Sequence, residues 1–207
     1  MIFAFKSSRR NSNKNIGYKK FLINTGKKYK GRNYKIEGDA SSASYFLEAA
    51  AITKGKIKVK NINPNSKQGD IRFADMLGKM GCSIKKGSDF IELKGEKLSG
   101  IDVDMNDVPD LVPALAVTSV FADSETTIKN VPNLRLKETD RIRALSLERR
   151  KIGADVKELA DGLRIKRRRL RKAVIETYND HRIAMSFAVA GLAVSGIRIK
   201  NPDCVNK

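Results

Sequence analysis

One short run of the chain gathers side chains that could bind an anion and transfer a proton. Residues 133–142 contain an asparagine, a lysine, two arginines and two acidic residues directly ahead of a segment with a helical pattern. The free N–H groups and the macrodipole at a helix start favour bound anions. Lys137 and Arg141, four residues apart, can bind a phosphate or a carboxylate there, and Glu138 can transfer a proton. An ordinary salt-bridged helix start fits the same residues equally well, so the rest of the sequence must decide.

The elements that must position this run form a repeat. Asp39, Asp110 and Asp180 each precede a helix-like apolar stretch, and aspartate is a strong helix N-cap. Each predicted helix leads into a short alternating strand that ends in Lys-Asn. These strands are predicted at residues 57–61, 127–130 and 197–201.

In the first two copies of the repeat, a second helix and a hairpin follow the strand. Apolar residues at i, i+3, i+4 and i+7 from Phe73 predict a helix with one buried face, which ends at Gly81; the matching helix ends at Gly153. Hairpin patterns follow at residues 83–93 and 155–165. We therefore expect an α/β fold of repeated β-α-β-α-β-β units. The third copy stops after its first strand, so we expect a domain truncated at its C-terminus.

The composition is that of a globular protein without a metal site. With 41% hydrophobic and 31% charged residues, the 207-residue chain does not resemble a disordered one. No apolar run is long enough to cross a bilayer, so no membrane partner is expected. Two cysteines and one histidine are too few for a zinc site or a disulfide framework. These features predict a reducing, cytoplasmic setting; a plastid location is the minor alternative, because the first fifteen residues are basic and rich in serine and asparagine.

A formal net charge of +19 raises the alternative of a nucleic-acid-binding domain. Much of the excess is local, because no acidic residue precedes Glu37 and residues 164–172 form a basic block. That block lacks the interleaved aromatic residues of a single-strand binder. We expect residues 167–169 to form a solvated loop, and nucleic acid is not the expected partner.

Four motifs resemble the EPSP synthase (3-phosphoshikimate 1-carboxyvinyltransferase) family. They are Gly-Asp-Ala-Ser-Ser-Ala-Ser-Tyr-Phe-Leu at 38–47, Asn-Asp-Val-Pro-Asp at 106–110, Leu-Lys-Glu-Thr-Asp-Arg at 136–141 and Thr-Tyr-Asn-Asp-His-Arg-Ile-Ala-Met at 177–185. Several long motifs in the right order make the resemblance specific. It implies one globular half of the two-domain enolpyruvyl transferase fold, an inside-out α/β barrel. Residues 37–207 would be this domain, and residues 1–36 a basic segment with remnant strands of the other domain.

The resemblance implies transfer of the enolpyruvyl group of phosphoenolpyruvate to the 5-hydroxyl of shikimate 3-phosphate, giving EPSP and phosphate. It implies no cofactor and no metal. An enolpyruvyl transferase acting on a nucleotide sugar is the related alternative. The run at 137–141 argues against that alternative, because it is similar to the shikimate enzyme.

The resemblance also implies roles for individual residues. The catalytic pair would be Asp110, as the base for the attacking hydroxyl, and Glu138, as the proton donor. The substrate contacts would be Asn133 and Lys137 to the phosphate of shikimate 3-phosphate, Arg141 and Arg182 to the carboxylate of phosphoenolpyruvate, and Lys207 near the transferred phosphate. Asp39 and Asp180 are expected to be N-caps beside the site, and His181 either polarises a substrate group or packs beside the cleft.

Two departures from the family predict a loss of activity. The first half of the family's fold supplies further basic and serine contacts, so we expect the isolated chain to have little or no activity and to need a complementary first-half chain. The second departure is Arg149, seven residues after Ile142, where the helical period asks for an apolar residue. Burying an unpaired arginine costs several kcal/mol, so we expect the helix to rotate, fray or let the side chain reach solvent.

Overall fold

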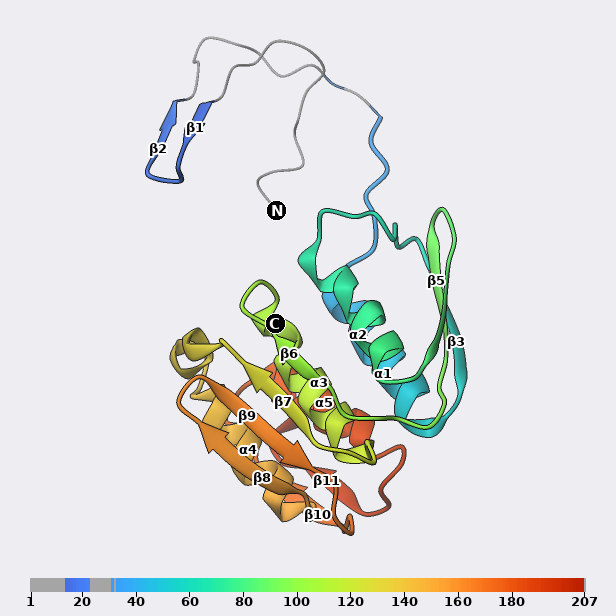
Figure 1. Cartoon of the computed structure of the whole chain (residues 1–207), viewed down its shortest axis with the longest axis vertical. Coiled ribbons are helices and arrows are strands. Elements are labelled where there is room, and N and C mark those ends of the chain that lie inside the picture. Colours follow the sequence, from blue (N-terminus) through green and yellow to red (C-terminus); the bar gives the residue numbers. More distant parts are fainter. Residues whose placement is uncertain (1–13, 23–30, 32, 207) are drawn as a thin grey trace. The chain divides into compact units, whose positions relative to one another are not determined.

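The computed structural model describes residues 14–22, 31 and 33–206, which fall in two compact units with a boundary between Ile36 and Glu37. In the smaller unit, strands β1 (Lys14–Ile16) and β2 (Lys20–Leu22) form an antiparallel hairpin whose side chains are exposed (Figure 1). That this unit is a remnant of another domain stays a prediction.

The larger unit is built from helices and strands that alternate along the chain. Its α-helices are α1 (Ala40–Thr53), α2 (Phe73–Lys79), α3 (Val112–Thr118), α4 (Arg141–Lys151) and α5 (His181–Ala190). Its strands are β3 (Lys56–Lys60), β4 (Ser83–Lys86), β5 (Phe90–Lys94), β6 (Asp102–Asp104), β7 (Thr126–Lys129), β8 (Asp155–Leu159), β9 (Gly162–Lys166), β10 (Ala173–Ile175) and β11 (Ile197–Ile199). Short 3-10 helices lie at Gly69–Arg72, Pro109–Leu111, Ser119–Phe121, Pro132–Leu136 and Pro202–Val205.

The strands form three sheets, one for each copy of the repeat. The first sheet has the order β3-β5-β4, the second β6-β7-β9-β8, and the third pairs β10 with β11. In the second sheet β6 runs parallel to β7, and in the third β10 runs parallel to β11. The predicted hairpins, β4–β5 in the first sheet and β8–β9 in the second, are antiparallel. The predicted β-α-β-α-β-β unit is thus complete in the second copy, and the expected α/β class is confirmed.

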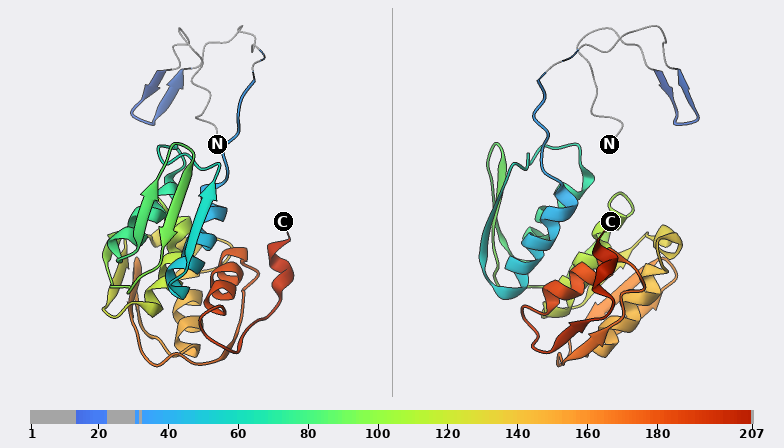
Figure 2. Two further views of the ribbon diagram at one scale, coloured as in Figure 1. Left: turned by 90° about the vertical axis from the view of Figure 1, so that its right-hand side faces the viewer. Right: turned by 180° about the vertical axis from the view of Figure 1, so that it is seen from behind.

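The helices α1, α3 and α5 pack against one another, and the sheets lie on the outside of this helical cluster (Figures 1 and 2). This arrangement puts the core between the helices and the inner faces of the sheets. Fully buried residues such as Phe73, Leu115, Ile128 and Phe187 belong to one continuous cluster. Among the residues that the structure describes, no helix is long and apolar enough to cross a membrane.

The predicted helix caps are confirmed at two of three positions. The carboxylate of Asp39 accepts from the N–H groups of Ser41 and Ser42 at the start of α1, and Asp180 accepts from the N–H groups at the start of α5. The prediction is wrong for Asp110, which lies inside a 3-10 turn and caps no helix. Its carboxylate contacts basic side chains instead, as described below.

The expectation for Arg149 is also wrong. The helix α4 is continuous past this residue, and the guanidinium is 0% exposed. Glu48 of α1, equally buried, supplies the opposing charge. Burial raises the pKa of Glu48 and lowers that of Arg149 to about 9, and in each case the partner's charge acts in the opposite direction. A buried partner on another helix, invisible to the helical period, thus keeps this arginine inside.

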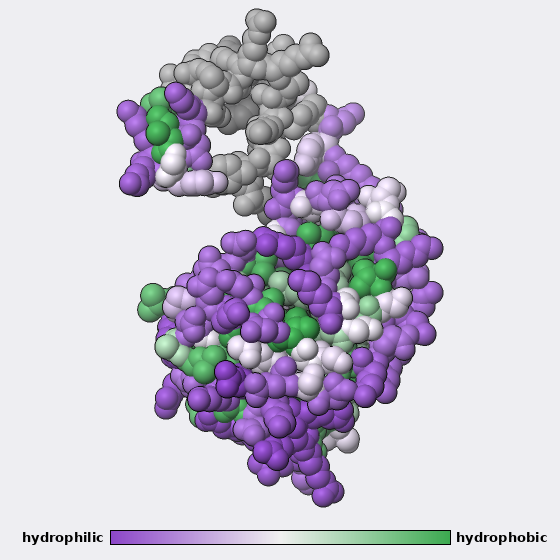
Figure 3. Space-filling view, in the orientation of Figure 1, coloured by the Kyte–Doolittle hydropathy of each residue, from purple (hydrophilic) through white to green (hydrophobic). Residues whose placement is uncertain are grey.

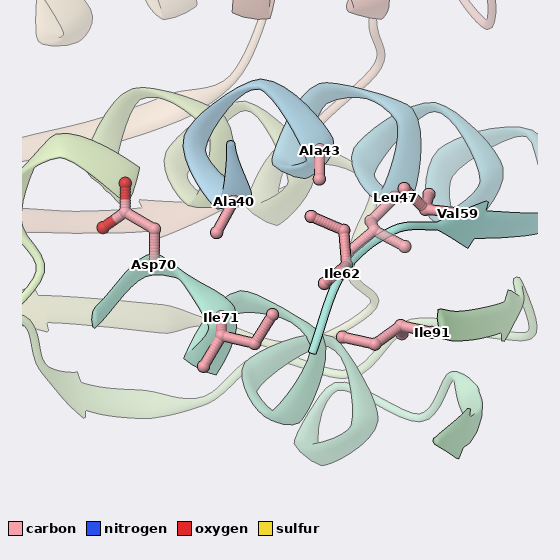
Figure 4. A pocket seen from close by; sticks show the side chains of 8 residues that line it. All are labelled: Ala40, Ala43, Leu47, Val59, Ile62, Asp70, Ile71 and Ile91. Atoms are coloured by element: carbon pink, nitrogen blue, oxygen red, sulfur yellow. The ribbon is translucent and has the colours of Figure 1, made fainter. Parts of the chain in front are cut away.

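A small cavity of about 10 Å³ lies where α1 packs on the first sheet (Figure 4). Its lining is apolar except for Asp70, which lies near the start of α1 and whose carboxylate points away from the apolar side chains in Figure 4. There Asp70 accepts a hydrogen bond from the Ser41 hydroxyl. The cavity is at most the size of a single water molecule, so it is a packing feature and not a substrate site.

The basic loop, residues 167–172, lines an open groove of about 670 Å³. The C-terminal end of α1, the end of the 3-10 helix Ser119–Phe121 and the segment after α5 line it too. The guanidinium of Arg171 donates to the carbonyl of Lys151 at the end of α4, and that of Arg167 donates to the carbonyl of Phe121. Arg168 pairs with Asp155. Cations are favourable beside helix C-termini, so part of the basic block acts as caps and is not merely solvated. In Figure 3 the lower end of the larger unit, where β10 lies in Figure 1, is hydrophilic.

Candidate functional site

Three copies of the repeat meet at one cluster of charged side chains. The start of α5 lies beside the 3-10 turn before α3. Arg182 of α5 donates to the carboxylate of Asp110 in that turn at 3.3 Å and to its backbone carbonyl at 3.4 Å. The charge of Arg182 also acts on Asp39 at the start of α1. The positive ends of α1 and α5 therefore converge here, which favours a bound anion.

Arg141, the first residue of α4, lies at the centre of the cluster. Its side chain is 1% exposed, and each of its three nitrogens donates to a carboxylate. Its Nε lies 2.7 Å from Asp180 Oδ2, its Nη2 2.7 Å from Glu138 Oε2, and its Nη1 3.0 Å from Asp110 Oδ1. A planar guanidinium can hold three carboxylates in this fixed geometry, whereas lysine cannot.

Asp110 is shared by the three cations of the cluster. Besides Arg141 and Arg182, the Nζ atom of Lys137 lies 3.4 Å from its Oδ1. Burial raises the pKa of the Asp110 carboxyl, but the positive charges, that of Arg182 first, outweigh burial and hold the pKa below its usual value. The carboxyl is therefore ionised and able to accept a proton.

Glu138 and His181 are neighbours on the exposed side of the cluster. The Nδ1 atom of His181 lies 3.7 Å from Glu138 Oε1, while Glu138 Oε2 contacts Arg141. Both side chains are about one-third exposed, at 33% for Glu138 and 27% for His181. A carboxyl group beside an imidazole and open to solvent can exchange a proton with a bound molecule.

The predicted substrate contacts differ in how the structure places them. Lys137, Arg141 and Arg182 all lie in the cluster. Asn133 is exposed in the 3-10 turn Pro132–Leu136, on the same run of chain. Lys207 lies outside the described residues.

The named charges of the cluster balance one another. Lys137, Arg141 and Arg182 face the carboxylates of Asp110, Glu138 and Asp180. An incoming phosphate or carboxylate would therefore compete with Asp110 for these cations. Lys137 and Arg182, at 32% and 15% exposure, are more accessible to it than the buried Arg141. A polyanion that displaces an ionised aspartate would leave that aspartate free to act as a base.

The run at residues 133–142 also contains ordinary salt bridges, which Arg135 forms outside the cluster. Its Nη1 atom lies 2.8 Å from Asp140 and 2.9 Å from Glu158, and its other nitrogens donate to backbone carbonyls of the β8–β9 turn. This arginine anchors the loop that carries Lys137. The spacing alone could not tell the anchoring arginine from the one in the cluster.

Tyr45 of α1 also contacts the cluster, although its sequence context does not indicate this. Burial raises the pKa of its hydroxyl to about 12, and the nearby Arg182, which hydrogen-bonds this hydroxyl, acts in the opposite direction. Tyr45 lies inside the first motif, but a tyrosine in an apolar helix gives no sign of a partner from another copy of the repeat.

Comparison with known proteins identifies the family of the chain. The family model of EPSP synthase (3-phosphoshikimate 1-carboxyvinyltransferase) matches residues 12–207. A 3-phosphoshikimate 1-carboxyvinyltransferase of Nostoc punctiforme is 50% identical over 193 residues, 93% of this chain and 45% of that protein. The enzyme of the same name from Proteus mirabilis is 50% identical over 195 residues, 93% of this chain and 46% of its own length.

Solved structures give the same result. An EPSP synthase from Acinetobacter baumannii superposes with a TM-score of 0.80 at 30% identity, over 94% of this chain and 48% of that one. The enolpyruvyl transferase NikO from Streptomyces tendae, at 16% identity and a TM-score of 0.64 over 82% of this chain and 40% of that one, shares the fold. The chain thus spans about half the length of the relatives that it matches. With nearly its whole length matched by the family model, the chain belongs to the EPSP synthase (3-phosphoshikimate 1-carboxyvinyltransferase) family.

Proposed function

We propose that the cluster around Arg141 is one wall of a site that transfers the enolpyruvyl group of phosphoenolpyruvate to the 5-hydroxyl of shikimate 3-phosphate. The observation that carries this proposal is the contact of Asp110 with Lys137, Arg141 and Arg182, three cations from two copies of the repeat. Both substrates are anions, and both need such cations.

The roles follow from exposure and charge. Lys137 and the exposed Asn133 would hold the phosphate of shikimate 3-phosphate, and Arg182 the carboxylate of phosphoenolpyruvate. Arg141, whose nitrogens are all engaged, would bind that carboxylate only after Asp110 has turned away. Asp110 would then take the proton of the attacking hydroxyl.

Glu138 would supply a proton to the enol carbon, because it is the partly exposed carboxyl beside His181. In the addition step a bond forms between the hydroxyl oxygen and the enolpyruvyl carbon while the carbon–carbon double bond takes up the proton. Elimination of phosphate then restores the double bond, with a proton returned to a base. Addition would move two protons, one from the hydroxyl to Asp110 and one from Glu138 to the enol carbon, and elimination would return one from the new methyl group to a base.

We further propose that turnover needs groups from the part of the relatives' length that this chain does not match. Preorganised charge on one side of a substrate leaves the other side to water, which weakens transition-state stabilisation. A complementary chain covering the remaining part would then be the partner. The bacterial relatives and the two free, buried cysteines support a reducing cytoplasmic setting for this reaction.

Phosphate release tests the proposal. The purified chain is mixed with shikimate 3-phosphate and phosphoenolpyruvate, alone and with a chain spanning the rest of the Nostoc punctiforme enzyme. We expect little release by the chain alone and clear release by the pair, lost again in the variant Lys137→Ala. Robust release by the chain alone would overturn the need for a partner. A stable pair without release would overturn the assigned reaction.

The basic groove favours no second function, because Arg167, Arg168 and Arg171 are already engaged with carbonyls or a carboxylate of the chain. Residues 167–172 also lack the interleaved aromatic side chains on which a single-strand binder would stack bases, so nucleic acid is not proposed as a partner.

A further inference from the structure

The turn that leads into α5 has a strained backbone. Tyr178 and Asn179 have φ values of 54° and 55°, in the left-handed region. Asparagine tolerates this region, but a bulky side chain such as tyrosine rarely adopts it. The turn closes with a hydrogen bond of 2.9 Å from the N–H of Asp180 to the carbonyl of Thr177. Strain of this kind persists only where neighbouring contacts hold it.

Glu148, a residue of α4 that is 0% exposed, provides those contacts. Its Oε1 accepts a hydrogen bond of 2.6 Å from the hydroxyl of Tyr178, and its Oε2 one of 3.1 Å from the N–H of Glu176. The ammonium of Lys151 lies 2.7 Å from Oε2. Burial raises the pKa of Tyr178, and the hydrogen bond to Glu148 acts in the same direction, so the hydroxyl stays a donor.

The helix α4 therefore holds this segment at two points. Arg141 and Glu148 are seven residues apart, which is two turns of helix and places them on the same side about 10 Å apart. Glu148 contacts Glu176 and Tyr178, whereas Arg141 contacts Asp180 through two of its nitrogens, at 2.7 and 3.3 Å. The strained turn lies between these two attachments.

Asp180 connects the turn to the charged cluster. Its carboxylate orients the guanidinium of Arg141 and also accepts from the N–H of Arg182 at 2.9 Å. A displacement of the turn would move both arginines that face Asp110.

We propose that Glu148 is a positioning residue for the site of the proposed function, on which this inference rests. Through Tyr178 and Glu176, it fixes the strained turn and so sets Asp180, which in turn orients Arg141 and the start of α5. Glu148 itself does not touch a substrate, because both of its oxygens are engaged away from the cluster.

The test must separate positioning from ordinary stability. Tyr178→Phe removes only the hydroxyl, and Glu148→Gln keeps the shape but loses an acceptor. The matched control is Ser119→Ala, which removes a buried hydroxyl that donates to the carbonyl of Leu115 at 2.7 Å, within the core helix α3 and its extension. All variants are studied at a temperature at which circular dichroism shows them fully folded.

Two readouts are taken on each variant: the dissociation constant for shikimate 3-phosphate by calorimetry, and the NMR resonance of the Arg141 Nε–Hε group. We expect Tyr178→Phe and Glu148→Gln to weaken binding about fivefold or more. Both should shift or broaden the Arg141 resonance. Ser119→Ala should stay within about twofold of the parent in affinity and leave the resonance in place, even with a similar loss of Tm.

An unchanged affinity and an unchanged Arg141 resonance in Tyr178→Phe would overturn the positioning role. Equal effects of Ser119→Ala and Tyr178→Phe would also overturn it, because they would indicate a general loss of stability. If the parent chain fails to bind shikimate 3-phosphate, the proposed function fails, whereas the Arg141 resonance still tests the role of Glu148.

Discussion

The buried charges of Glu48 and Arg149 make a strong prediction for stability. Both side chains are 0% exposed, on α1 and α4, and each feels the other's charge. Within the described part of the chain, their charged atoms have no hydrogen-bond partner, so their mutual attraction is the main compensation for lost hydration. Removal of one partner from a buried pair typically costs about 3–5 kcal/mol, because the other charge is left uncompensated.

A double-mutant cycle measures this coupling. Glu48→Leu and Arg149→Leu should each lower the free energy of unfolding by about 3–5 kcal/mol, a large share of the ~5–15 kcal/mol of a typical domain. The double variant should regain most of this loss, because two leucines replace two charges that lack hydrogen bonds. The coupling energy should then exceed about 3 kcal/mol.

The pH dependence of Arg149→Leu gives an independent check. Without the arginine, burial alone acts on Glu48, and its folded-state pKa rises further above the unfolded value of 4.5. A raised carboxyl pKa leaves stability intact below the unfolded pKa and removes it as the pH rises toward the folded pKa. Stability should therefore fall by about 1.4 kcal/mol per pH unit above about pH 5.

Urea unfolding followed by far-UV circular dichroism at pH 5 and pH 8 is the assay. Single variants that fail to fold while the double variant folds would agree with the prediction. Additive single effects of under about 1 kcal/mol would rule out a coupled buried pair, since they would mean that the two charges are hydrated.

Three further predictions concern a cap, a glycine and the charged cluster. Asp39→Ala should lower the free energy of unfolding by about 1 kcal/mol through loss of the α1 cap, as measured in urea; no change would show that the cap is redundant. Gly153→Ala should cost about 1–3 kcal/mol, because φ is 96° and the new Cβ would lie 2.4 Å from the carbonyl oxygen of Arg169; a neutral substitution would contradict this backbone geometry. The lowered pKa of Asp110 means that its ion pairs stabilise the fold above the unfolded pKa and are lost as the pH falls through the folded pKa. Asp110→Asn should therefore flatten the loss of stability below about pH 4. An unchanged dependence of stability on acid pH would show that Asp110 does not contribute to this loss.

The repeat could be predicted from sequence because its signals are local. Aspartate caps, an apolar period from Phe73 and glycines at 81 and 153 each act within a few residues, and the helices and hairpins follow from them. The leading strands β6 and β10 were not located, because three residues give too short a period to recognise.

The partners of individual charges could not be predicted, because they come from other copies of the repeat. The charged side chain of Arg149 does not suit a buried helix face unless an opposite charge lies nearby, and that charge comes from Glu48 on another helix. Asp110 has the sequence of a helix cap, but it contacts basic residues 31 and 72 positions away. Glu148 lies directly after the exposed Leu147, and nothing in the sequence indicates that it contacts Tyr178 from another copy of the repeat.

The proposed function requires that the cluster around Arg141 binds shikimate 3-phosphate through Lys137, its most exposed cation. Calorimetric titration of the chain with shikimate 3-phosphate tests it, with Lys137→Ala compared against Lys79→Ala, an exposed lysine at the end of α2. We expect saturable binding by the parent chain, about tenfold or more weaker in Lys137→Ala and unchanged in Lys79→Ala. The claim would be contradicted if the parent chain showed no saturable binding or if both lysine variants lost affinity equally.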